Sequence, residues 1–488
     1  MMTAPKHLPS WSFKTAVAEV LASPGAVVGE DATLGDIAST LVRGAGQVAV
    51  QRADGTFVAL VESADALDLL LRGHPPGTPL ARLSLKRQTM LDGSGSVFDA
   101  LVALARSGAR ALPVSDADGR FAGVASMDGL LVRAQSDVVE LACLAASGAD
   151  GMSLRAMREK QAALAERLSA AEIPADQILA ALTDINNEVH RQVAQRVLAE
   201  LEAEGWGRPP VAFALFTMGS GGRGENFLAP DQDNGLIIAD HDERDRRAVE
   251  SYFIAFAEQV TRRLADAGLP LCRGNMMATS PVWRKSMAEW RKQISLWTRL
   301  RDPVHLMNCD TLIDFKHVCG DEALSRELRT VLQQAIATAP GFVRALYSIE
   351  ENHGVALDWL GRIALEKDDV GRTDLTNIKL RGTLPLLEGT RLLAVKAGVT
   401  STSTIERLRQ LGEKRIIGSD LLGDLIAAYR TIAGLLLHQQ IRSVRLGREA
   451  TDSIDVAALE RRERKALHAA IRSVGRFRSA LPSLLEQA

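Results

Sequence analysis

The stretch Met218–Glu225, with the sequence MGSGGRGE, is followed closely by Asp231–Asn234, with the sequence DQDN. The apolar run Val211–Met218 predicts a β-strand, so the glycines after it predict a turn at the end of that strand. Asp231 and Asp233 open the next predicted strand, and side chains two residues apart on a strand point to the same face. The pattern therefore predicts a glycine turn that carries a serine, followed by two carboxylates that face the same way.

Two other interpretations of this turn fail on spacing. The glycines of Gly219–Gly224 match the GxGxxG pattern of dinucleotide-binding proteins, and Asp240 follows at the end of the second strand. That fold needs a full helix between the glycines and the second strand. Only the segment Glu225–Asn234 is available, and it contains Pro230 and lacks helical apolar spacing. A Walker phosphate loop is excluded because no Lys-Ser/Thr pair follows the turn.

The remaining interpretation uses each of these residues. Ser220 and the backbone amides after it would hold the phosphates of a nucleotide, because exposed N–H groups at a helix start bind anions. Asp231 and Asp233 would hold two Mg²⁺ ions, which prefer oxygen ligands. Such a site activates a hydroxyl and stabilises charge at the α-phosphorus as pyrophosphate leaves. We expect transfer of a group from a nucleoside triphosphate.

Composition excludes several other classes of function. The 488 residues carry a formal net charge of −2, so no global basic field recruits nucleic acid or an anionic membrane. Aromatic residues make up only 4%, which argues against a base-stacking surface. The scattered cysteines have no CxxC spacing, which predicts reduced thiols without a structural metal. No run of about 18 apolar residues and no signal-peptide core occurs, so we expect a cytoplasmic protein without a membrane span.

An internal repeat occupies the first part of the chain. Ala53–Ala59 recurs as Ala117–Gly123, 64 residues later. In each copy a short apolar strand precedes an Asp-Gly pair and a second strand follows it. The Asp-Gly pair favours the positive φ angles of a tight hairpin turn. We expect two small α/β units that bury their faces against each other.

This repeat resembles a tandem CBS (Bateman) module, which pairs two β-α-β-β-α units and often binds adenine nucleotides between them. In that family a Thr or Ser and an Asp three residues later hold the nucleotide. The first repeat keeps Asp65 but has Glu62 at the hydroxyl position, and the second keeps Ser126 but has Gly129 at the aspartate position. The resemblance implies a CBS fold, with Asp65 and Ser126 as candidate ligand residues. A purely structural or dimerising role remains the alternative.

The rest of the chain divides by its hydrophobic periodicity. Residues 137–204 predict a helical connector, in which Ile173–Asp176 separates two helices. The Gly- and Pro-rich linker Gly205–Pro210 marks the start of a third region. We expect a tandem CBS module over 1–136, a helical connector over 137–204, an α/β nucleotidyltransferase domain over 205–322 and an all-α domain over 323–488.

The glycine turn and the DQDN segment resemble the polymerase-β-like nucleotidyltransferase superfamily. The closest likeness is to the N-terminal part of PII-protein uridylyltransferases and to the related DUF294 group, in which CBS repeats commonly precede the transferase. That superfamily carries a third carboxylate on a later strand. The resemblance assigns this role to Asp314, with Asp310 as a weaker candidate, and Lys316 stands where relatives usually have an arginine. Lysine keeps the charge but loses the bidentate geometry.

The resemblance also supplies candidate site residues. Asp231, Asp233 and Asp314 are the expected catalytic residues and metal ligands. The helical segments Asn377–Gly382 and Arg391–Ala394 resemble the family's substrate-binding domain. The expected nucleotide-binding residues are Gly219, Ser220, Gly222, Arg223, Glu225, Lys379 and Arg391.

Two functions follow from these expectations. The first is a Mg²⁺-dependent nucleotidyltransferase that moves a nucleoside monophosphate from an NTP to a hydroxyl, on a protein or a small molecule, under control of the CBS pair. The second is a non-catalytic nucleotide sensor. In both cases the expected partners are nucleotides, including an adenine nucleotide at the CBS pair, and a second copy of the chain through the CBS or helical regions. Base preference and acceptor are not encoded in the motifs.

Overall fold

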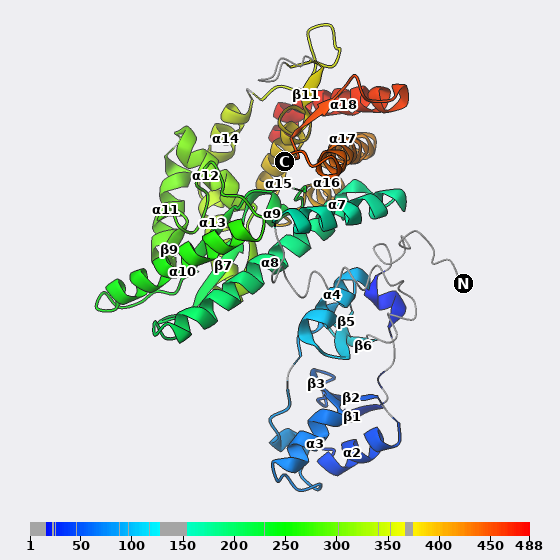
Figure 1. Ribbon diagram of the computed structural model, residues 1–488, viewed down its shortest axis with the longest axis vertical. Coiled ribbons are helices and arrows are strands. Elements are labelled where there is room, and N and C mark those ends of the chain that lie inside the picture. Colours follow the sequence, from blue (N-terminus) through cyan, green and yellow to red (C-terminus); the bar gives the residue numbers. More distant parts are fainter. Residues whose placement is uncertain are drawn as a thin grey trace. The chain divides into compact units, whose positions relative to one another are not determined.

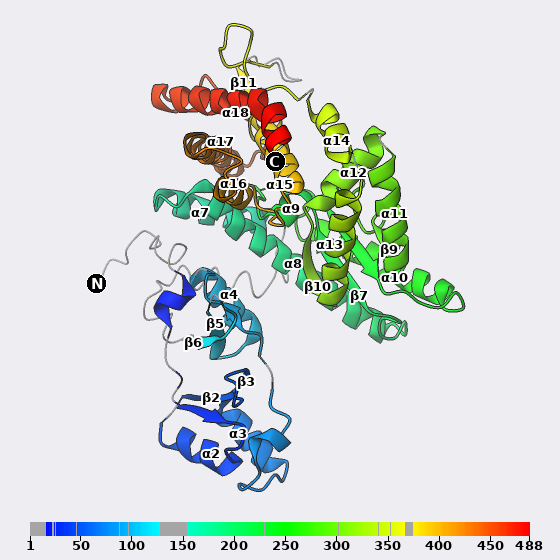
Figure 2. The same cartoon turned by 180° about the vertical axis from the view of Figure 1, so that it is seen from behind.

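The computed structural model describes residues 16–126 and 154–488, apart from residues 22, 23, 25, 45, 87, 96, 117, 229, 301, 340, 352 and 367–373. The chain divides into two compact units, Met1–Ser147 and Gly148–Ala488. Both units mix helices with strands, so the fold class is α/β (Figure 1 and, from behind, Figure 2).

The N-terminal unit contains two copies of one strand-helix-strand-strand arrangement. In each copy the first strand pairs in parallel with the second, and the second pairs antiparallel with the third. The first copy continues into the helix α3. The elements of the first copy are β1 (Ala26–Gly29), α2 (Leu34–Val42), β2 (Gln47–Gln51), β3 (Phe57–Glu62) and α3 (Ser63–Leu71). The second copy has β4 (Leu91–Asp92), α4 (Val97–Ser107), β5 (Ala111–Ser115) and β6 (Phe121–Ser126).

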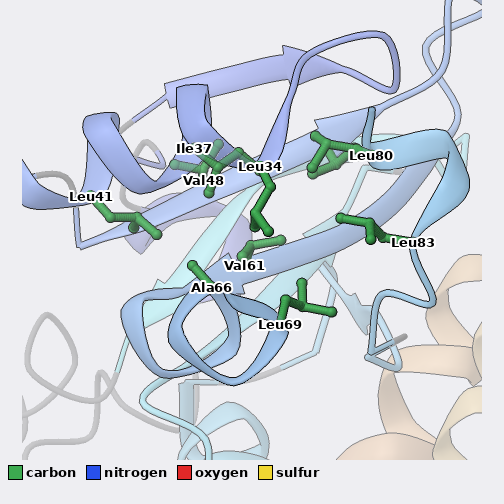
Figure 3. Packing of buried hydrophobic residues seen from close by; sticks show 10 residues of the cluster. Leu34, Ile37, Leu41, Val48, Val61, Ala66, Leu69, Leu80 and Leu83 are labelled. Atoms are coloured by element: carbon green, nitrogen blue, oxygen red, sulfur yellow. The ribbon is translucent and has the colours of Figure 1, made fainter. Parts of the chain in front are cut away.

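Both expected hairpins form around their glycines. Gly55 joins β2 to β3 at a φ of 83°, and Gly119 joins β5 to β6 at 77°, which is the left-handed region that glycine enters at little cost. The helices α2 and α3 bury their apolar faces against β2 and β3, with Leu34, Ile37 and Val61 in the centre of that core (Figure 3). The two Asp-Gly hairpins are confirmed.

The two copies pack together through equivalent residues. Phe57 and Phe121, which occupy the same place in the repeat, stack with ring centroids 4.9 Å apart. Beside them, the strand residues Ala49, Leu60, Ala111 and Val124 form one buried cluster. Contacts between equivalent positions indicate an approximate two-fold relation, as the repeat predicts. The helix expected after β6 falls in residues 127–153, outside the described residues.

The second unit is built on a four-stranded sheet in the order β10-β7-β8-β9. Its strands are β7 (Phe213–Thr217), β8 (Asn234–Ile238), β9 (Arg284–Ser286) and β10 (Lys316–Gly320). The central strands β7 and β8 are buried along their whole length, which explains their continuous apolar sequence. The helices around this sheet are α10 (Arg246–Asp266), α11 (Met287–Arg299), α12 (Pro303–Ile313) and α13 (Glu322–Ala337).

Two long helices precede this sheet, α7 (Leu154–Ala170) and α8 (Ala175–Ala203). Pro174 is the N-cap of α8, which confirms the expected break at this point. The helix α8 packs against α10 and β10. The segment that the sequence predicts as a connector is therefore part of the core of the second unit.

The C-terminal half is mainly helical. Its helices are α14 (Phe342–Glu350), α15 (Leu384–Lys396), α16 (Thr404–Glu413), α17 (Ser419–Arg445) and α18 (Arg461–Gln487), with a π-helix, η3 (Lys379–Thr383), before α15. The expectation of an all-α domain is wrong in one respect. The short strands β11 (Leu375–Asn377) and β12 (Ser453–Asp455) pair antiparallel. These strands have only three residues each, too few for a period-two pattern to stand out in the sequence.

Within the described part of the chain, α17 is the one helix that is long and apolar enough to cross a membrane. The same helix packs against α18, α7 and α8, and Leu425, Ile432 and Leu436 are buried there. A helix at the centre of a helical bundle is apolar for this reason. Its composition is therefore weak evidence for a membrane span.

Acid should destabilise the second unit through His190. This residue of α8 is buried, and burial lowers its pKa from 6.5 to about 4. Between pH 6.5 and pH 4 this histidine is protonated in the unfolded chain and neutral in the folded chain. The free energy of unfolding therefore falls as the pH drops through this range. Through His190, the wild type should lose about 2 kcal/mol of unfolding free energy between pH 7.5 and pH 5. We expect His190→Gln to remove this part of the loss. Denaturant unfolding of both proteins at the two pH values measures this, and parallel losses would contradict it.

Candidate functional site

The glycine turn leaves β7 and becomes a short helix. Met218 is extended, Gly219 has a φ of 54°, and the helix α9 (Gly219–Arg223) ends at Gly224 with a φ of 77°. The Met218 amide donates a hydrogen bond of 2.9 Å to the carbonyl of Asp233. The turn therefore begins directly beside the aspartate pair.

The aspartate pair lies just before β8 and not inside it, because the strand begins at Asn234. Gln232 between them is fully buried, and its side-chain amide donates to the carbonyls of Thr261 at 3.0 Å and Leu269 at 2.7 Å. Since alternate residues of extended backbone point in opposite directions, this anchor directs Asp231 and Asp233 away from the core. The pair faces one way, as the sequence predicts.

Position 219 leaves little room for a side chain beside this pair. A Cβ at Gly219 would lie 3.0 Å from Oδ2 of Asp233. Burial, followed by the charge of Asp231, raises the pKa of Asp233 to about 6. The Oδ1 atom of Asp233 is buried without a hydrogen-bond partner among the described residues. A buried, unsatisfied carboxylate oxygen beside a second carboxylate fits a divalent cation that prefers oxygen ligands.

A third side chain joins the pair, and it was not among the expected site residues. The ligand atoms of Asp231, Asp233 and Cys272 all lie within 4.8 Å of one another. Burial, followed by the Asp233 charge, raises the thiol pKa to about 12. In the sequence, Cys272 is one of four scattered cysteines. Its place directly after Leu271, in a segment that lies between the site motifs, was the one available signal.

Asp314 is the main expected site residue that the structure places elsewhere. It is fully buried and forms ion pairs with Arg223 at 3.0 Å, Arg391 at 3.0 Å and Arg407 at 2.6 Å. Although burial opposes ionisation, the three guanidinium groups hold the pKa of Asp314 well below its usual range. Asp314 is not part of the cluster around Asp233. Its charge is already neutralised by arginines, so it does not fit the role of third metal ligand.

The same packing explains why position 222 is glycine. A Cβ at Gly222 would come within 1.7 Å of the Asp314 carbonyl oxygen. Asp310, the weaker candidate, pairs with Arg391. Lys316, which stands at the position of an arginine in relatives, is half exposed and lies 3.4 Å from Asp184. The region around Asp314 is therefore a buried ion-pair network between the sheet and the helical half.

Other expected nucleotide-binding residues tie the turn to its surroundings. Ser220 donates through its hydroxyl to Asn226 at 2.8 Å. Arg223 donates to Glu225 at 2.9 Å, and Glu225 accepts a hydrogen bond of 2.8 Å from the Thr404 amide at the start of α16. These contacts fix the turn against the helical half. Arg223 and Glu225 are therefore already paired with other groups of the protein.

The turn has a second face, away from the aspartates. Residues 222–225 line a cavity of about 770 Å³. Its other walls come from α8, α13, α16, α17, residues 315–317 and the loop 400–403. Asp231 and Asp233 are not part of its lining. The structure therefore separates Gly219, which lies beside Asp233, from the later turn residues 222–225.

The two expected residues of the helical half have different surroundings. Lys379 begins the π-helix η3, is half exposed, and lies 3.2 Å from Asp452. The charges of Arg223 and Lys379 both oppose the rise in the pKa of Asp233. Arg391 is buried, with ion pairs to Asp310 and Asp314. Of the two expected residues of the helical half, Lys379 is the one whose charge acts on Asp233.

Two family models match the second unit of the chain. Residues 159–304 match "Putative nucleotidyltransferase DUF294", and residues 340–483 match "Putative nucleotidyltransferase substrate binding domain". Together they cover more than half of the 488 residues. The chain belongs to the DUF294 family. The DUF294 match contains the glycine turn, both aspartates and Cys272, whereas Lys379 and Arg391 lie in the second match. No functionally curated protein resembles this DUF294 chain significantly.

Solved structures similar to this DUF294 protein are CBS-domain proteins, and each covers about a quarter of the chain. One from Pyrobaculum aerophilum, complexed with AMP, is 20% identical, covers 26% of this chain and 95% of its own, with a TM-score of 0.23. A CBS pair/ACT domain protein from Thermotoga maritima is 20% identical, with coverages of 24% and 95% and a TM-score of 0.21. A CBS domain protein of unknown function from Thermoplasma acidophilum is 18% identical, with coverages of 26% and 72% and a TM-score of 0.24.

The two expected ligand residues of the repeat lie at the end of the third strand of each copy or shortly after it. Asp65 lies in the first turn of α3, where its Oδ2 accepts a hydrogen bond of 2.9 Å from the Glu62 amide. Burial, followed by the charge of Asp65, raises the pKa of Glu62. Ser126 is the last residue of β6. In this DUF294 protein Asp65 therefore serves as a helix cap.

Proposed function

We propose that this DUF294 protein is a Mg²⁺-dependent nucleotidyltransferase that moves a nucleoside monophosphate from an NTP to a hydroxyl acceptor. One observation carries the proposal. The glycine turn and the carboxylate pair are in contact, because the Met218 amide donates a hydrogen bond of 2.9 Å to the Asp233 carbonyl and a Cβ at Gly219 would lie 3.0 Å from Asp233 Oδ2. This contact would bring a triphosphate held by the turn to a cation held by Asp231 and Asp233.

In the proposed reaction the acceptor hydroxyl oxygen forms a bond to the α-phosphorus of the NTP. The bond from that phosphorus to the oxygen bridging to the β-phosphate breaks, and pyrophosphate leaves while the hydroxyl loses its proton. Mg²⁺, when bound by Asp231 and Asp233, supplies positive charge for the phosphate oxygens. Ser220 and the turn amides would orient the phosphates. Lys379 of the helical half, whose charge acts on Asp233, would contact them.

Asp314 and Arg391 have a different place in this proposal. Their ion pair joins the end of α12 to α15, and Arg223 of α9 binds the same carboxylate. We assign both residues to positioning, because a buried network at this point fixes the glycine turn against the substrate-binding half. The catalytic carboxylates are then Asp231 and Asp233.

The test is a transfer assay with Mg²⁺, each of the four labelled NTPs and cell lysate as the source of acceptors. We expect the wild type to label at least one acceptor. Labelling that is equal in an Asp231→Asn/Asp233→Asn variant would refute the proposed catalytic pair. A wild type that labels nothing, but still binds Mg²⁺·NTP, would favour the second function below.

Two glycine variants should separate backbone strain from damage to the site. Gly219 and Gly224 both have positive φ angles, so alanine at either position costs about 1 kcal/mol of stability. Only the new methyl group at Gly219 meets Asp233, whereas nothing lies within 4 Å at Gly224. We expect Gly219→Ala to weaken Mg²⁺-dependent NTP binding about tenfold and Gly224→Ala to change it little. Calorimetric titration measures both, and equal losses would contradict the assigned role of Gly219.

A second candidate function is a non-catalytic nucleotide sensor. The observation that favours it is the pairing of Asp314 with three arginines. This pairing leaves Asp231 and Asp233 as the two carboxylates of the site. In this case NTP binding would depend on Asp231 and Asp233 without turnover on any acceptor. Metal-independent AMP binding by the full chain that is lost in Asp65→Ala would assign a separate nucleotide site to the CBS pair.

The division of labour completes the proposal. Residues 1–136 would regulate, residues 205–322 would carry the transfer site, and residues 323–488 would bind the acceptor or nucleotide, with 137–204 between them. We place the protein in the cytoplasm as a homodimer that forms through its CBS or helical regions. Sedimentation of the full chain tests the dimer.

A further inference from the structure

Cys272 lies next to the aspartate pair because of the register of a short backbone pairing. Gln232 forms a parallel bridge with Leu271, and the Gln232 amide donates to the carbonyl of Pro270 at 2.9 Å. The next residues along the two segments are Asp233 and Cys272, which therefore run side by side. The Asn275 amide donates back to the Cys272 carbonyl at 3.0 Å and closes a turn there. The backbone thus fixes the thiol at this place.

The three side chains have the arrangement of an incomplete metal site. Their ligand atoms lie within 4.8 Å of one another, and no other such group of three comes as close in the part of the chain that the structure describes. The Oδ1 atom of Asp233 is buried without a partner. Asp231 is exposed, so its carboxylate can close the remaining distance to a shared cation.

The thiol adds nothing for Mg²⁺, which prefers oxygen ligands and water. A cation of the Zn²⁺ class is different, because it binds thiolate sulfur at about 2.3 Å and carboxylate oxygen at about 2.0–2.2 Å, and usually with four ligands. Two carboxylates and one thiolate would supply three of the four ligands and leave one position for water or a phosphate oxygen. The thiolate sulfur, together with the negative charge of the two carboxylates, then determines which cation binds.

We propose that Asp231, Asp233 and Cys272 bind a thiophilic divalent cation of the Zn²⁺ class, which takes the place of Mg²⁺ at the carboxylate pair. On binding, the Cys272 S–H bond breaks, its proton passes to solvent, and the sulfur binds the cation. While the thiophilic cation is bound, Mg²⁺ could not bind to the two carboxylates. The thiophilic cation would in this way control the activity of the site. The inference rests on the proposed function only in placing a divalent cation at these two carboxylates.

Cadmium titration of the full-length protein under reducing conditions tests the site, because Cd²⁺ bound to a thiolate absorbs in the ultraviolet and Mg²⁺ does not. We expect the wild type to develop this absorption with one Cd²⁺ per chain. Cys272→Ser should abolish it, and Asp231→Asn/Asp233→Asn should weaken Cd²⁺ binding about tenfold or more. Cys319→Ser, which removes another partly buried thiol on β10, is the matched control and should keep the full signal. Thermal melting of each variant identifies any loss of folding, and Cys272→Ala replaces a variant that does not fold.

An unchanged signal in Cys272→Ser, or no signal in the wild type, would overturn the inference. An unchanged Cd²⁺ affinity in the double aspartate variant would also overturn it, since the carboxylates would then take no part. These outcomes are distinct from failure of the proposed function. A wild type that transfers nucleotide with Mg²⁺ but gives no cadmium signal keeps the function and loses the thiophilic site. A wild type that gives the cadmium signal but transfers no nucleotide keeps the thiophilic site and loses the proposed function.

Discussion

Replacement of both aspartates, Asp231→Asn/Asp233→Asn, should abolish Mg²⁺-dependent NTP binding and lower transfer by about a thousandfold or more. Both carboxylates face the same way beside the glycine turn, and Oδ1 of Asp233 is buried without a partner. Asparagine keeps the size of the side chain and removes the charge that holds the cation. Stability should not fall, because two neighbouring negative charges repel each other and burial already raises the pKa of Asp233. Calorimetry with Mg²⁺ and a non-hydrolysable NTP measures binding, and thermal melting measures stability.

The matched control is Asp242→Asn/Glu243→Gln, which removes the same charge from exposed positions shortly after β8. Both side chains lie on the surface and pair with the exposed arginines Arg244 and Arg246. We expect this variant to bind Mg²⁺·NTP like the wild type. Equal binding by the Asp231/Asp233 variant and the wild type would show that the cation lies elsewhere.

Asp314→Asn should destabilise the second unit by about 3–5 kcal/mol. The change leaves three guanidinium groups, those of Arg223, Arg391 and Arg407, around a neutral side chain in a buried place. Removal of one partner from a buried ion pair is costly because the remaining charges cannot return to water. Denaturant unfolding of wild type and variant at neutral pH measures the loss.

Asp184→Asn is the control for this prediction. Asp184 is paired with the half-exposed Lys316, and a surface pair of this kind contributes about 0–1 kcal/mol. If Asp314 were instead a metal ligand, its replacement would leave stability unchanged and remove metal-dependent NTP binding. That result would contradict the structural role assigned here and restore the expectation of a third catalytic carboxylate.

The sequence was most informative where a feature depends on a few neighbouring residues. The two hairpins around Gly55 and Gly119 depend on Asp-Gly pairs that favour positive φ. The common direction of Asp231 and Asp233 follows from the alternation of extended backbone, and buried Gln232 between them enforces it. The break between α7 and α8 follows from one proline. The hairpins and the helix break were predicted at their correct positions because each arises from local geometry, whereas the aspartate pair was expected in a strand that begins at Asn234.

The sequence was less informative about charged residues. Arg223 and Arg391 were expected at the nucleotide and Asp314 at the metal, because a family pattern records which residues recur and not which of them pair. Arg223 and Arg391 lie 91 and 77 residues from Asp314 in the chain, yet all three meet in one buried network. No periodicity or spacing encodes such a meeting. The strands β11 and β12 escaped prediction for a related reason, since their pairing partners are far apart in sequence.

The sequence by itself determined the turn, the carboxylate pair, the repeat and the family. The tertiary structure alone decided that Asp314 neutralises arginines, that Gly219 rather than Gly222 contacts Asp233, and that Cys272 joins the site through the bridge between Gln232 and Leu271. The physical reason is the separation along the chain over which each kind of interaction acts. Backbone conformation and side-chain alternation act over a few residues, whereas burial and ion pairing act between whichever residues the completed fold brings together.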